Sequence, residues 1–248
     1  SAEFVQNYLE EAKAANEAKQ DFFSKMSHDI RTPINGIRGM VEIAGHYKDN
    51  PVKQQECLEK IQESSGLLLE LVNEVLDMGK LESGEIVLES RPFHVLHLVH
   101  DITTIIEKQA AERGIEIISG VPSVQHPCLI GSPIHIKRLL MNIVSNAVKY
   151  NHDGGSVTVT CREVSYTDTI AEYELTCTDT GIGMSEEFQK KAFEPFAQEG
   201  QSARTKYAGT GLGLAIARKL TELQGGTLFF DSIQGKGTKF ILHISFEI

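Results

Sequence analysis

The sequence predicts an α+β protein in which a long helical hairpin precedes a domain of mixed strands and helices. Three observations predict this arrangement. The first 83 residues carry apolar residues at heptad-like spacing and few glycines, which is typical of long helices. From Gly84 onward, short strand-like runs alternate with amphipathic helical runs, as in a sheet with helices on one face. The 248 residues suffice for two domains of ~100–200 residues each.

The first 46 residues are expected to form one long helix that ends at a turn over residues 47–51. Pro33 has no N–H, so the carbonyl of Asp29 loses its helical partner and we expect a bend there. Polar Asn16 and Lys19 interrupt the apolar stripe, as register-setting polar residues do. The stripe consists of Val5, Leu9, Ala12, Phe23, Met26, Ile30, Ile37 and Met40.

A second stripe predicts a second long helix, and the short connection makes the pair antiparallel. It consists of Leu58, Ile61, Ser65, Leu68, Val72, Val75 and Met78. One hairpin cannot bury both stripes fully, so we expect a homodimer with a four-helix bundle. The alternative is that the hairpin packs only on the domain that follows.

The second domain, residues 84–248, is expected to be an α/β sandwich. Its strand-like runs are Ile86–Glu89, Ile115–Ser119, Val157–Val164, Glu172–Thr178, Thr227–Asp231 and Phe240–Phe246, and its helical runs lie near 94–112, 133–150 and 210–224. The segment Leu81–Gly84 is expected to link the two domains.

Charge and composition exclude several classes of protein. The 24 basic residues against 34 acidic ones give a net charge of −10, the opposite of what a general nucleic-acid binder needs. No apolar run is long enough to span a membrane. The four cysteines match no metal or redox spacing, so buried thiols in a reducing compartment are expected. The chain opens with Ser, which indicates a piece of a longer protein.

Two glycine segments indicate a phosphate-binding site. One follows a predicted strand and covers residues 179–184, and the other, residues 209–214, precedes a predicted helix. Glycines let the backbone approach a phosphate, and a helix N-terminus offers free N–H groups. A polar stretch with Arg204 and Lys206 lies between them. Neither segment fits a Walker loop or a Rossmann fingerprint.

The helix before the first glycine segment carries polar residues on one face, at positions 142, 146 and 149/150. The amides of Asn142 and Asn146 offer oxygen ligands to Mg²⁺, Lys149 can meet a phosphate, and Tyr150 can stack on a base. Two asparagines in mid-helix are poor helix formers, which weakens the alternative of a merely solvated face. Asp179 can accept a hydrogen bond from adenine, although an Asp in a turn is also common.

His28 on the first helix is the candidate nucleophile. Imidazole forms covalent intermediates near neutral pH. The neighbouring Asp29 can hold one ring nitrogen and leave the other free to attack, and Thr32 shares the same helix face. The other histidines lack comparable neighbours, which favours His28 over them.

These motifs together resemble the catalytic core of a two-component sensor histidine kinase, over residues ~20–248. Residues 28–33 resemble the H-box, 142–150 the N-box, 179–183 the first glycine box, 193–196 the F-box and 209–214 the second glycine box. Asp29 departs from the usual Glu, and Asn151 departs from the usual Thr or Ser. Ala208 stands where a glycine often precedes the second glycine box.

The resemblance implies roles for particular residues. His28 accepts the γ-phosphoryl group of ATP, Asp29 acts as general base or orienter, and Thr32 aids dephosphorylation of the partner. The residues implied in ATP binding are Asn142, Asn146, Lys149, Tyr150, Asp179, Gly181, Gly183, Arg204, Lys206, Gly209, Thr210, Gly211, Leu212 and Gly213, with Asn142 and Asn146 on Mg²⁺ and Asn146 also catalytic. Phe193 and Phe196 are implied to anchor a lid.

The resemblance also implies an ATP-binding fold shared with gyrase and a response-regulator receiver domain as partner. Residues 1–20 then form a signalling coiled-coil helix from an upstream sensor domain, residues 21–83 the dimerisation and phosphotransfer domain, and residues 84–248 the catalytic domain. A cytoplasmic location and an origin in a hybrid kinase are further expectations.

Two other classes of protein remain open from the sequence. A degenerate kinase could serve as a signalling scaffold, although His28, Asn146, Asp179 and Gly211 are intact. A serine kinase of the mitochondrial type or a chaperone-like ATPase would share the nucleotide domain, but would have no need of the H-box.

Overall fold

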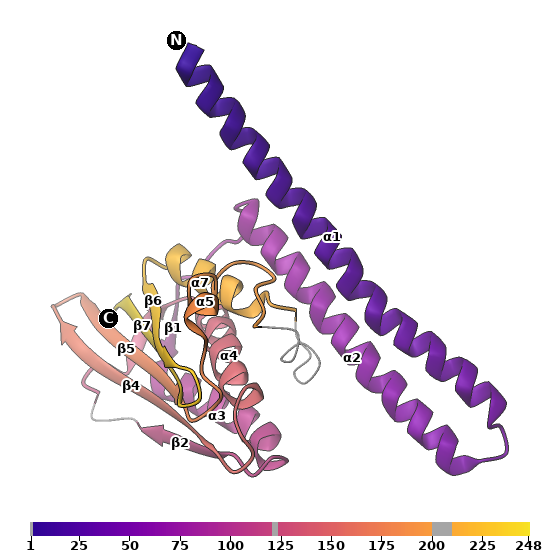
Figure 1. Cartoon of the computed structure of the whole chain (residues 1–248). Coiled ribbons are helices and arrows are strands. Elements are labelled where there is room, and N and C mark those ends of the chain that lie inside the picture. Colours follow the sequence, from indigo (N-terminus) through magenta and orange to yellow (C-terminus); the bar gives the residue numbers. More distant parts are fainter. Residues whose placement is uncertain (1, 121–123, 200–209) are drawn as a thin grey trace. The chain divides into compact units, whose positions relative to one another are not determined.

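The computed structural model describes residues 2–120, 124–199 and 210–248, and the chain divides into two compact units, Ser1–Asp77 and Met78–Ile248 (Figure 1). The helix that ends the first unit continues through Asp77 to Glu82. The expected domain limits at residues 20/21 and 83/84 therefore stay predictions.

The first unit is the predicted hairpin of two long helices, α1 (Ala2–His46) and α2 (Pro51–Glu82). Helix α1 runs through Pro33 without interruption. The Gln54 side chain donates to the carbonyls of Ala44 and Tyr47 at 2.6 and 3.0 Å, which satisfies the end of α1. Asn50 accepts from the Lys53 N–H at 3.1 Å as the cap of α2. The turn at 47–51 is thus confirmed.

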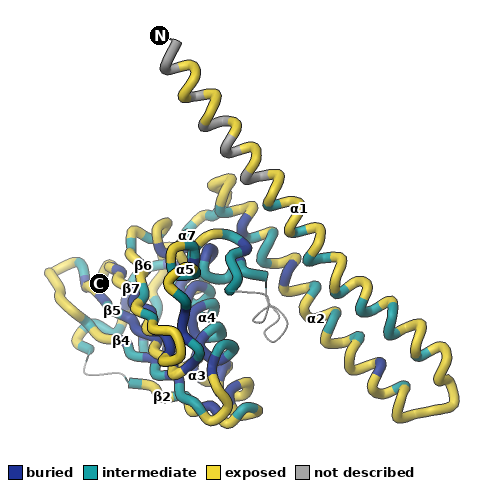
Figure 2. The backbone as a smooth tube through the Cα atoms, viewed as in Figure 1, coloured by how far each residue is buried: buried dark blue, intermediate teal, exposed yellow. Residues whose placement is uncertain are grey.

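The stripe predicted on α2 is divided between two faces of the helix, as expected if one hairpin buries it only in part. Ile61, Leu68 and Val75 belong to the less exposed face, which continues through Cys57, Ser64 and Leu71 at spacings of three and four. The hydroxyl of Ser64 lies only 3.3 Å from where a Cβ on Gly36 of α1 would be, so this face packs on α1. Leu58, Ser65 and Val72 are exposed instead. Figure 2 shows that the hairpin is mostly exposed or intermediate.

Seven strands within the described residues form one mixed sheet with the order β1-β3-β7-β5-β4-β2, and β6 also pairs with β7. Only β2 and β4 run parallel. The strands are β1 (Arg91–His94), β2 (Glu116–Gly120), β3 (Cys128–Gly131), β4 (Ser156–Tyr166), β5 (Ile170–Asp179), β6 (Thr227–Ile233) and β7 (Gly237–Glu247). The expected α+β sandwich is confirmed.

The strand predicted over Ile86–Glu89 does not form, and β1 and β3 were missed. The Glu89 N–H donates to the Ser132 hydroxyl at 3.1 Å rather than to a neighbouring strand. An alternating pattern needs a partner strand before it becomes a ladder. Strands β1 and β3 are only four residues long, which leaves too few residues for a recognisable alternation.

The helices α3 (Val95–Ala111), α4 (Pro133–Lys149) and α7 (Gly213–Leu223) lie on one side of the sheet, as Figure 1 shows, and a short α5 (Glu186–Gln189) follows the first glycine segment. Strand β7 shows why the sheet has one dry face. Phe240, Leu242 and Ile244 are buried while Lys239 and His243 are exposed, the period of two that a half-buried strand requires, with the buried Ile241 as an exception.

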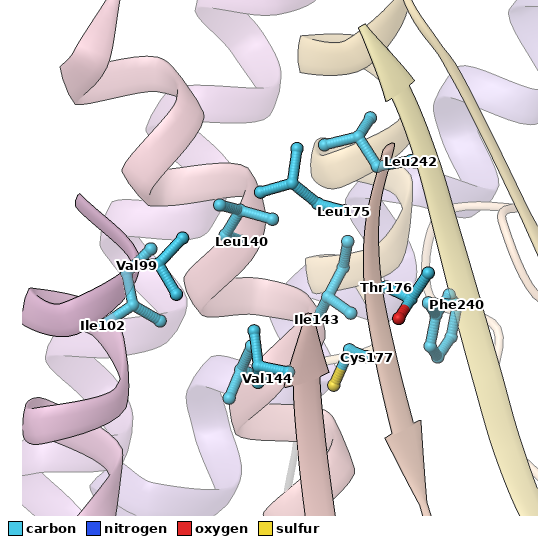
Figure 3. Close-up of a pocket in the computed structure, with 11 residues that line it drawn as sticks. Val99, Ile102, Leu140, Ile143, Val144, Leu175, Thr176, Cys177, Phe240 and Leu242 are labelled. Atoms are coloured by element: carbon cyan, nitrogen blue, oxygen red, sulfur yellow. The ribbon is translucent and has the colours of Figure 1, made fainter. Parts of the chain in front are cut away.

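A small apolar cavity of about 10 Å³ remains between the helices and the sheet. Figure 3 shows Val99 and Ile102 of α3 and Ile143 and Val144 of α4 across from Cys177 and the other strand residues that line it. Apolar cavities of this kind stay dry.

All four cysteines are free, and the expectation of buried thiols holds for three of them. Cys57, Cys161 and Cys177 are buried, and burial raises the pKa of Cys161 to about 12. Cys128 is exposed, so the prediction was wrong there, because an end residue of the short strand β3 is not covered by the helices. Among the described residues, no helix is long and apolar enough to cross a membrane.

Candidate functional site

The candidate phosphoacceptor His28 is presented on the surface of α1. Its side chain is 77% exposed, and its Nδ1 lies 3.0 Å from Oδ1 of Asp29. A carboxylate can only accept, so this contact places the proton on Nδ1 and leaves the lone pair on Nε2. The Thr32 hydroxyl, one turn on, donates to the His28 carbonyl at 3.2 Å. The helix thus holds an oriented, accessible nucleophile.

In the second unit, α4 brings the predicted polar residues to the edge of the glycine segments. Among the residues that the structure describes, none is a hydrogen-bond partner of the buried Nδ2 of Asn142. It belongs to a side chain that lies beside Gly213, at the start of α7. A buried amide left unpaired in the free protein is costly, which favours a ligand at this point. The ammonium of Lys149 lies 5.4 Å from the centre of the Tyr150 ring, so a cation and an aromatic face occupy the end of α4 together.

Asp179 closes β5 and is 8% exposed. Its Oδ1 accepts from the N–H groups of Gly181 at 2.8 Å and Thr238 at 3.2 Å. Burial raises the pKa of Asp179 to about 6, although these two hydrogen bonds lower it. Since both N–H groups use Oδ1, the Oδ2 atom is the one available for a ligand.

Each segment contains a glycine at which a side chain would not fit. A Cβ on Gly181 would collide with the Tyr150 carbonyl, which itself accepts from the Ile182 N–H at 3.0 Å. Gly211 has a φ of 73°, and a Cβ there would lie 2.8 Å from the Phe196 carbonyl carbon. Only glycine tolerates both conditions. These segments are packed backbone to backbone around the end of α4 and the start of α7.

The F-box phenylalanines pack beside the second glycine segment. The Phe193 ring contacts Phe230 at 5.4 Å and lies 5.0 Å from the Arg218 guanidinium of α7. Phe196 is buried with an unusual φ of 62°, and its N–H donates to the Gly211 carbonyl at 2.9 Å. The predicted residues Arg204, Lys206 and Gly209, and also Ala208, lie outside the described residues.

Three residues of this region were missed by sequence reasoning. Thr238 supplies a hydrogen bond to Asp179 from β7, and Asn151 is fully buried and bonds the Ser156 carbonyl and the His152 N–H at 2.9 Å each. Arg113 reaches the end of α4 from the loop after α3. No spacing connects these positions to the motifs, although the departure at Asn151 was a signal.

Two family models match the chain. The His Kinase A (phospho-acceptor) domain matches residues 18–84, and the histidine kinase-, DNA gyrase B-, and HSP90-like ATPase matches residues 131–248. His28 lies within the first range, and Asn142, Asp179 and Gly211 lie within the second.

Relatives and solved structures agree with these models. The sensor histidine kinase GacS of Pseudomonas protegens is 36% identical over 95% of this chain and 25% of its own length. BarA of Escherichia coli, a signal transduction histidine-protein kinase, is 32% identical over 96% of this chain and 26% of its own length. The structure of full-length ShkA in complex with AMPPNP is 28% identical, with a TM-score of 0.65 over 92% of this chain and 46% of that one. The complex of ThkA with the response regulator TrrA, 24% identical with a TM-score of 0.70 over 96% of this chain and 66% of that one, shares the fold.

The fold and the matches define a phosphoacceptor hairpin followed by an ATP-binding domain. The chain belongs to the sensor histidine kinases and comprises the two domains of a protein-histidine kinase. It spans about a quarter of the length of the curated relatives it matches.

Proposed function

We propose that this chain uses ATP to phosphorylate His28 and then passes the phosphoryl group to an aspartate of a response-regulator receiver domain. The observation that carries the proposal is the exposed His28 ring whose Nδ1 is held by Asp29. The Nε2 lone pair attacks the γ-phosphorus, the bond to the β–γ bridging oxygen breaks, and ADP leaves. Asp29 stabilises the positive charge that develops on the ring while the N–P bond forms.

The second unit would bind and orient the nucleotide. Oδ2 of Asp179 accepts from the exocyclic amino group of adenine, and Tyr150 lies near the base. The phosphates are held at the start of α7 by three cations and by the backbone of the second glycine segment. The cations are Lys149, Arg204 and Lys206, and the backbone is that of residues 209–213, which include Thr210 and Leu212. Positioning and charge neutralisation are the main demands of an in-line displacement.

Mg²⁺ fits the amides of Asn142 and Asn146 once phosphate oxygens complete its ligand set. Among the described residues, no group of three or more His, Cys, Asp or Glu side chains could hold a metal by itself. The unpartnered Nδ2 of Asn142 is a donor, so it would donate to a phosphate oxygen while the Oδ1 atom of the same amide would face the metal. Bound Mg²⁺ supplies charge neutralisation on the phosphates.

The remaining steps concern partners and the reverse reaction. The exposed apolar residues of the hairpin, among them Leu58, Leu69 and Leu76, would be covered by a second copy in a four-helix bundle. Thr32 would orient a water for dephosphorylation of the partner's aspartate. An upstream sensor domain, a cytoplasmic location and an origin in a hybrid kinase complete the proposal for the whole protein.

A labelling experiment tests the central step. The chain is incubated with γ-³²P-labelled ATP and Mg²⁺, and the expected label is acid-labile and base-stable. His28→Ala should abolish it, whereas His46→Ala, an exposed histidine of the same helix that bonds the Glu42 carbonyl, should retain it. Label that survives in His28→Ala contradicts the assignment of the phosphoacceptor.

A second experiment tests the metal. Asn146→Asp disturbs the metal's ligand set, so autophosphorylation should fall at least about tenfold. Binding of ADP in EDTA is the control, because it needs no metal and should change much less. Undiminished autophosphorylation would mean that the metal lies elsewhere.

A further inference from the structure

The carboxyl end of α4 forms one wall of the candidate nucleotide site, and its backbone carbonyls need partners. The last carbonyls of a helix have no N–H donors within the helix itself. Many helices solve this with a glycine directly after the last turn. Here Tyr150 follows the helix in an ordinary conformation, with φ of −93°, and a glycine with positive φ comes only at position 154. The Asn146 and Val148 carbonyls accept from the N–H groups of Tyr150 and Asn151 at 2.9 and 3.2 Å, and further donors come from another element.

Arg113 supplies them from the loop after α3. Its Nη1 donates to the carbonyls of Val148 at 2.7 Å and Lys149 at 3.1 Å, and its Nη2 donates to the carbonyl of Asn151 at 2.6 Å. Its Nε donates to Asp153 Oδ1 at 2.8 Å. A planar guanidinium with fixed donors suits several carbonyls at once, and its charge lies at the negative end of the helix dipole.

The residues held by Arg113 are the ones that border the site. Lys149 lies within the clamped segment, and so does Tyr150, whose carbonyl accepts from the Ile182 N–H in the first glycine segment. Asn151 continues the connection, because its Oδ1 accepts from the Thr180 hydroxyl at 3.2 Å. Thr180 follows Asp179 directly. A shift at the end of α4 therefore changes where Lys149 and Tyr150 lie relative to Asp179.

We propose that Arg113 is a positioning residue for nucleotide binding, which it serves by fixing the carboxyl end of α4 against the first glycine segment. This inference rests on the proposed function. Arg113 itself bonds only backbone carbonyls and Asp153 among the contacts recorded for its side chain in the described residues, so it acts through Lys149 and Tyr150.

The test compares nucleotide dissociation constants of folded variants. Arg113→Lys keeps the positive charge but loses the planar, forked set of donors. Arg113→Gln loses both the charge and that set of donors. We expect the Kd for ADP to rise about tenfold in Arg113→Gln, which is about 1.4 kcal/mol, with a smaller rise in Arg113→Lys. The KM for ATP should rise in parallel, while kcat at saturating ATP stays within about threefold.

Two variants serve as matched controls. Asp153→Asn removes only the exposed partner of Nε and should leave Kd within about twofold. Arg162→Gln removes another arginine of the same unit, ion-paired to Glu174 on the sheet, and should also leave Kd unchanged. A merely structural role would lower the fraction of binding-competent protein and the thermal midpoint, but not the Kd of the molecules that remain folded.

The outcomes separate this proposal from the function on which it rests. If the wild-type chain binds no adenine nucleotide, the proposed function fails. If the wild type binds and both Arg113 variants keep its Kd within twofold, the positioning role is overturned. Should Arg113→Gln fail to fold, the Kd of Arg113→Lys decides, with a rise of at least threefold expected and an unchanged value contradicting the proposal.

Discussion

The two proposed functional groups of this chain, His28 and Asp179, are positioned in opposite ways. His28 lies on an exposed helix surface, and its ring is oriented by the next residue in the chain. Asp179 is buried, and its Oδ1 is held by backbone N–H groups from two separate segments. A phosphoacceptor must be approached first by a nucleotide and then by a partner, so it stays accessible. A nucleotide site gains by fixing its groups in advance.

The largest expected effect comes from replacing the buried residue, Asp179. In Asp179→Asn, Oδ1 can still accept from Gly181 and Thr238, but the other atom becomes a donor that opposes the amino group of adenine. We expect ADP affinity to fall at least about 100-fold, measured by calorimetry. The free protein should become more stable, because burial disfavours the charged carboxylate.

Measuring the free energy of unfolding of a variant at the exposed residue, His28, sharpens the comparison. His28→Ala should abolish labelling yet change the free energy of unfolding by less than ~0.5 kcal/mol, as for most surface substitutions. If Asp179→Asn proved less stable than the wild type and kept its affinity for ADP, the account of Asp179 as a buried acceptor for adenine would be wrong.

The second prediction concerns the large apolar side chains, which are mostly buried in the ATPase unit and often exposed on the hairpin. Leu69 is 63% exposed on α2. If a second copy covers it, Leu69→Gln should weaken dimerisation at least about tenfold, since a buried Leu contributes ~1.5–3 kcal/mol. Analytical ultracentrifugation measures this over a dilution series. Val87→Gln, a change at a still more exposed apolar residue outside the helices, is the control and should leave the dimer intact. An unchanged dimer in Leu69→Gln would place the interface elsewhere.

The third prediction is a pH dependence of the free energy of unfolding that comes from the buried residue, Asp179. The pKa of Asp179 is about 6 in the folded protein against an ordinary value of 3.8, so the folded state binds more protons between these values. Wild-type stability is therefore lost relative to Asp179→Asn as pH rises through this window. The gap in unfolding free energy should widen by roughly 1 kcal/mol between pH 5 and 8. Urea unfolding at each pH measures it, and a constant gap would contradict the raised pKa.

The same contrast explains what the sequence could predict. The H-box and the glycine segments depend on neighbours in the chain, so His28–Asp29 and Gly211 could be assigned from local pattern. The hairpin and the long strands were predicted because their periodicity is sustained. Thr238 and Arg113 act on the site from elements distant in sequence, and no local pattern marks them. The sequence could not divide the α2 stripe between the side that packs on α1 and the side left exposed, because apolar residues on both sides share one periodic signal.

The smallest expected effect comes from filling the cavity beside α4. It tests whether the core behind the candidate nucleotide site is already fully packed. Val144 of α4 lines the cavity of about 10 Å³ between α3, α4 and the sheet (Figure 3). Val144→Ile adds one methyl group, and we expect it to raise the free energy of unfolding by ~0.5–1 kcal/mol if the cavity accepts it.

The Kd for ADP should not change, because Val144 is buried in the core side of the helix while Asn142 borders the glycine segment. Destabilisation by more than ~1 kcal/mol would show that the core is too tightly packed to accept the group. A changed Kd with unchanged stability would show that the position of α4 is set by its packing as well as by its clamped end.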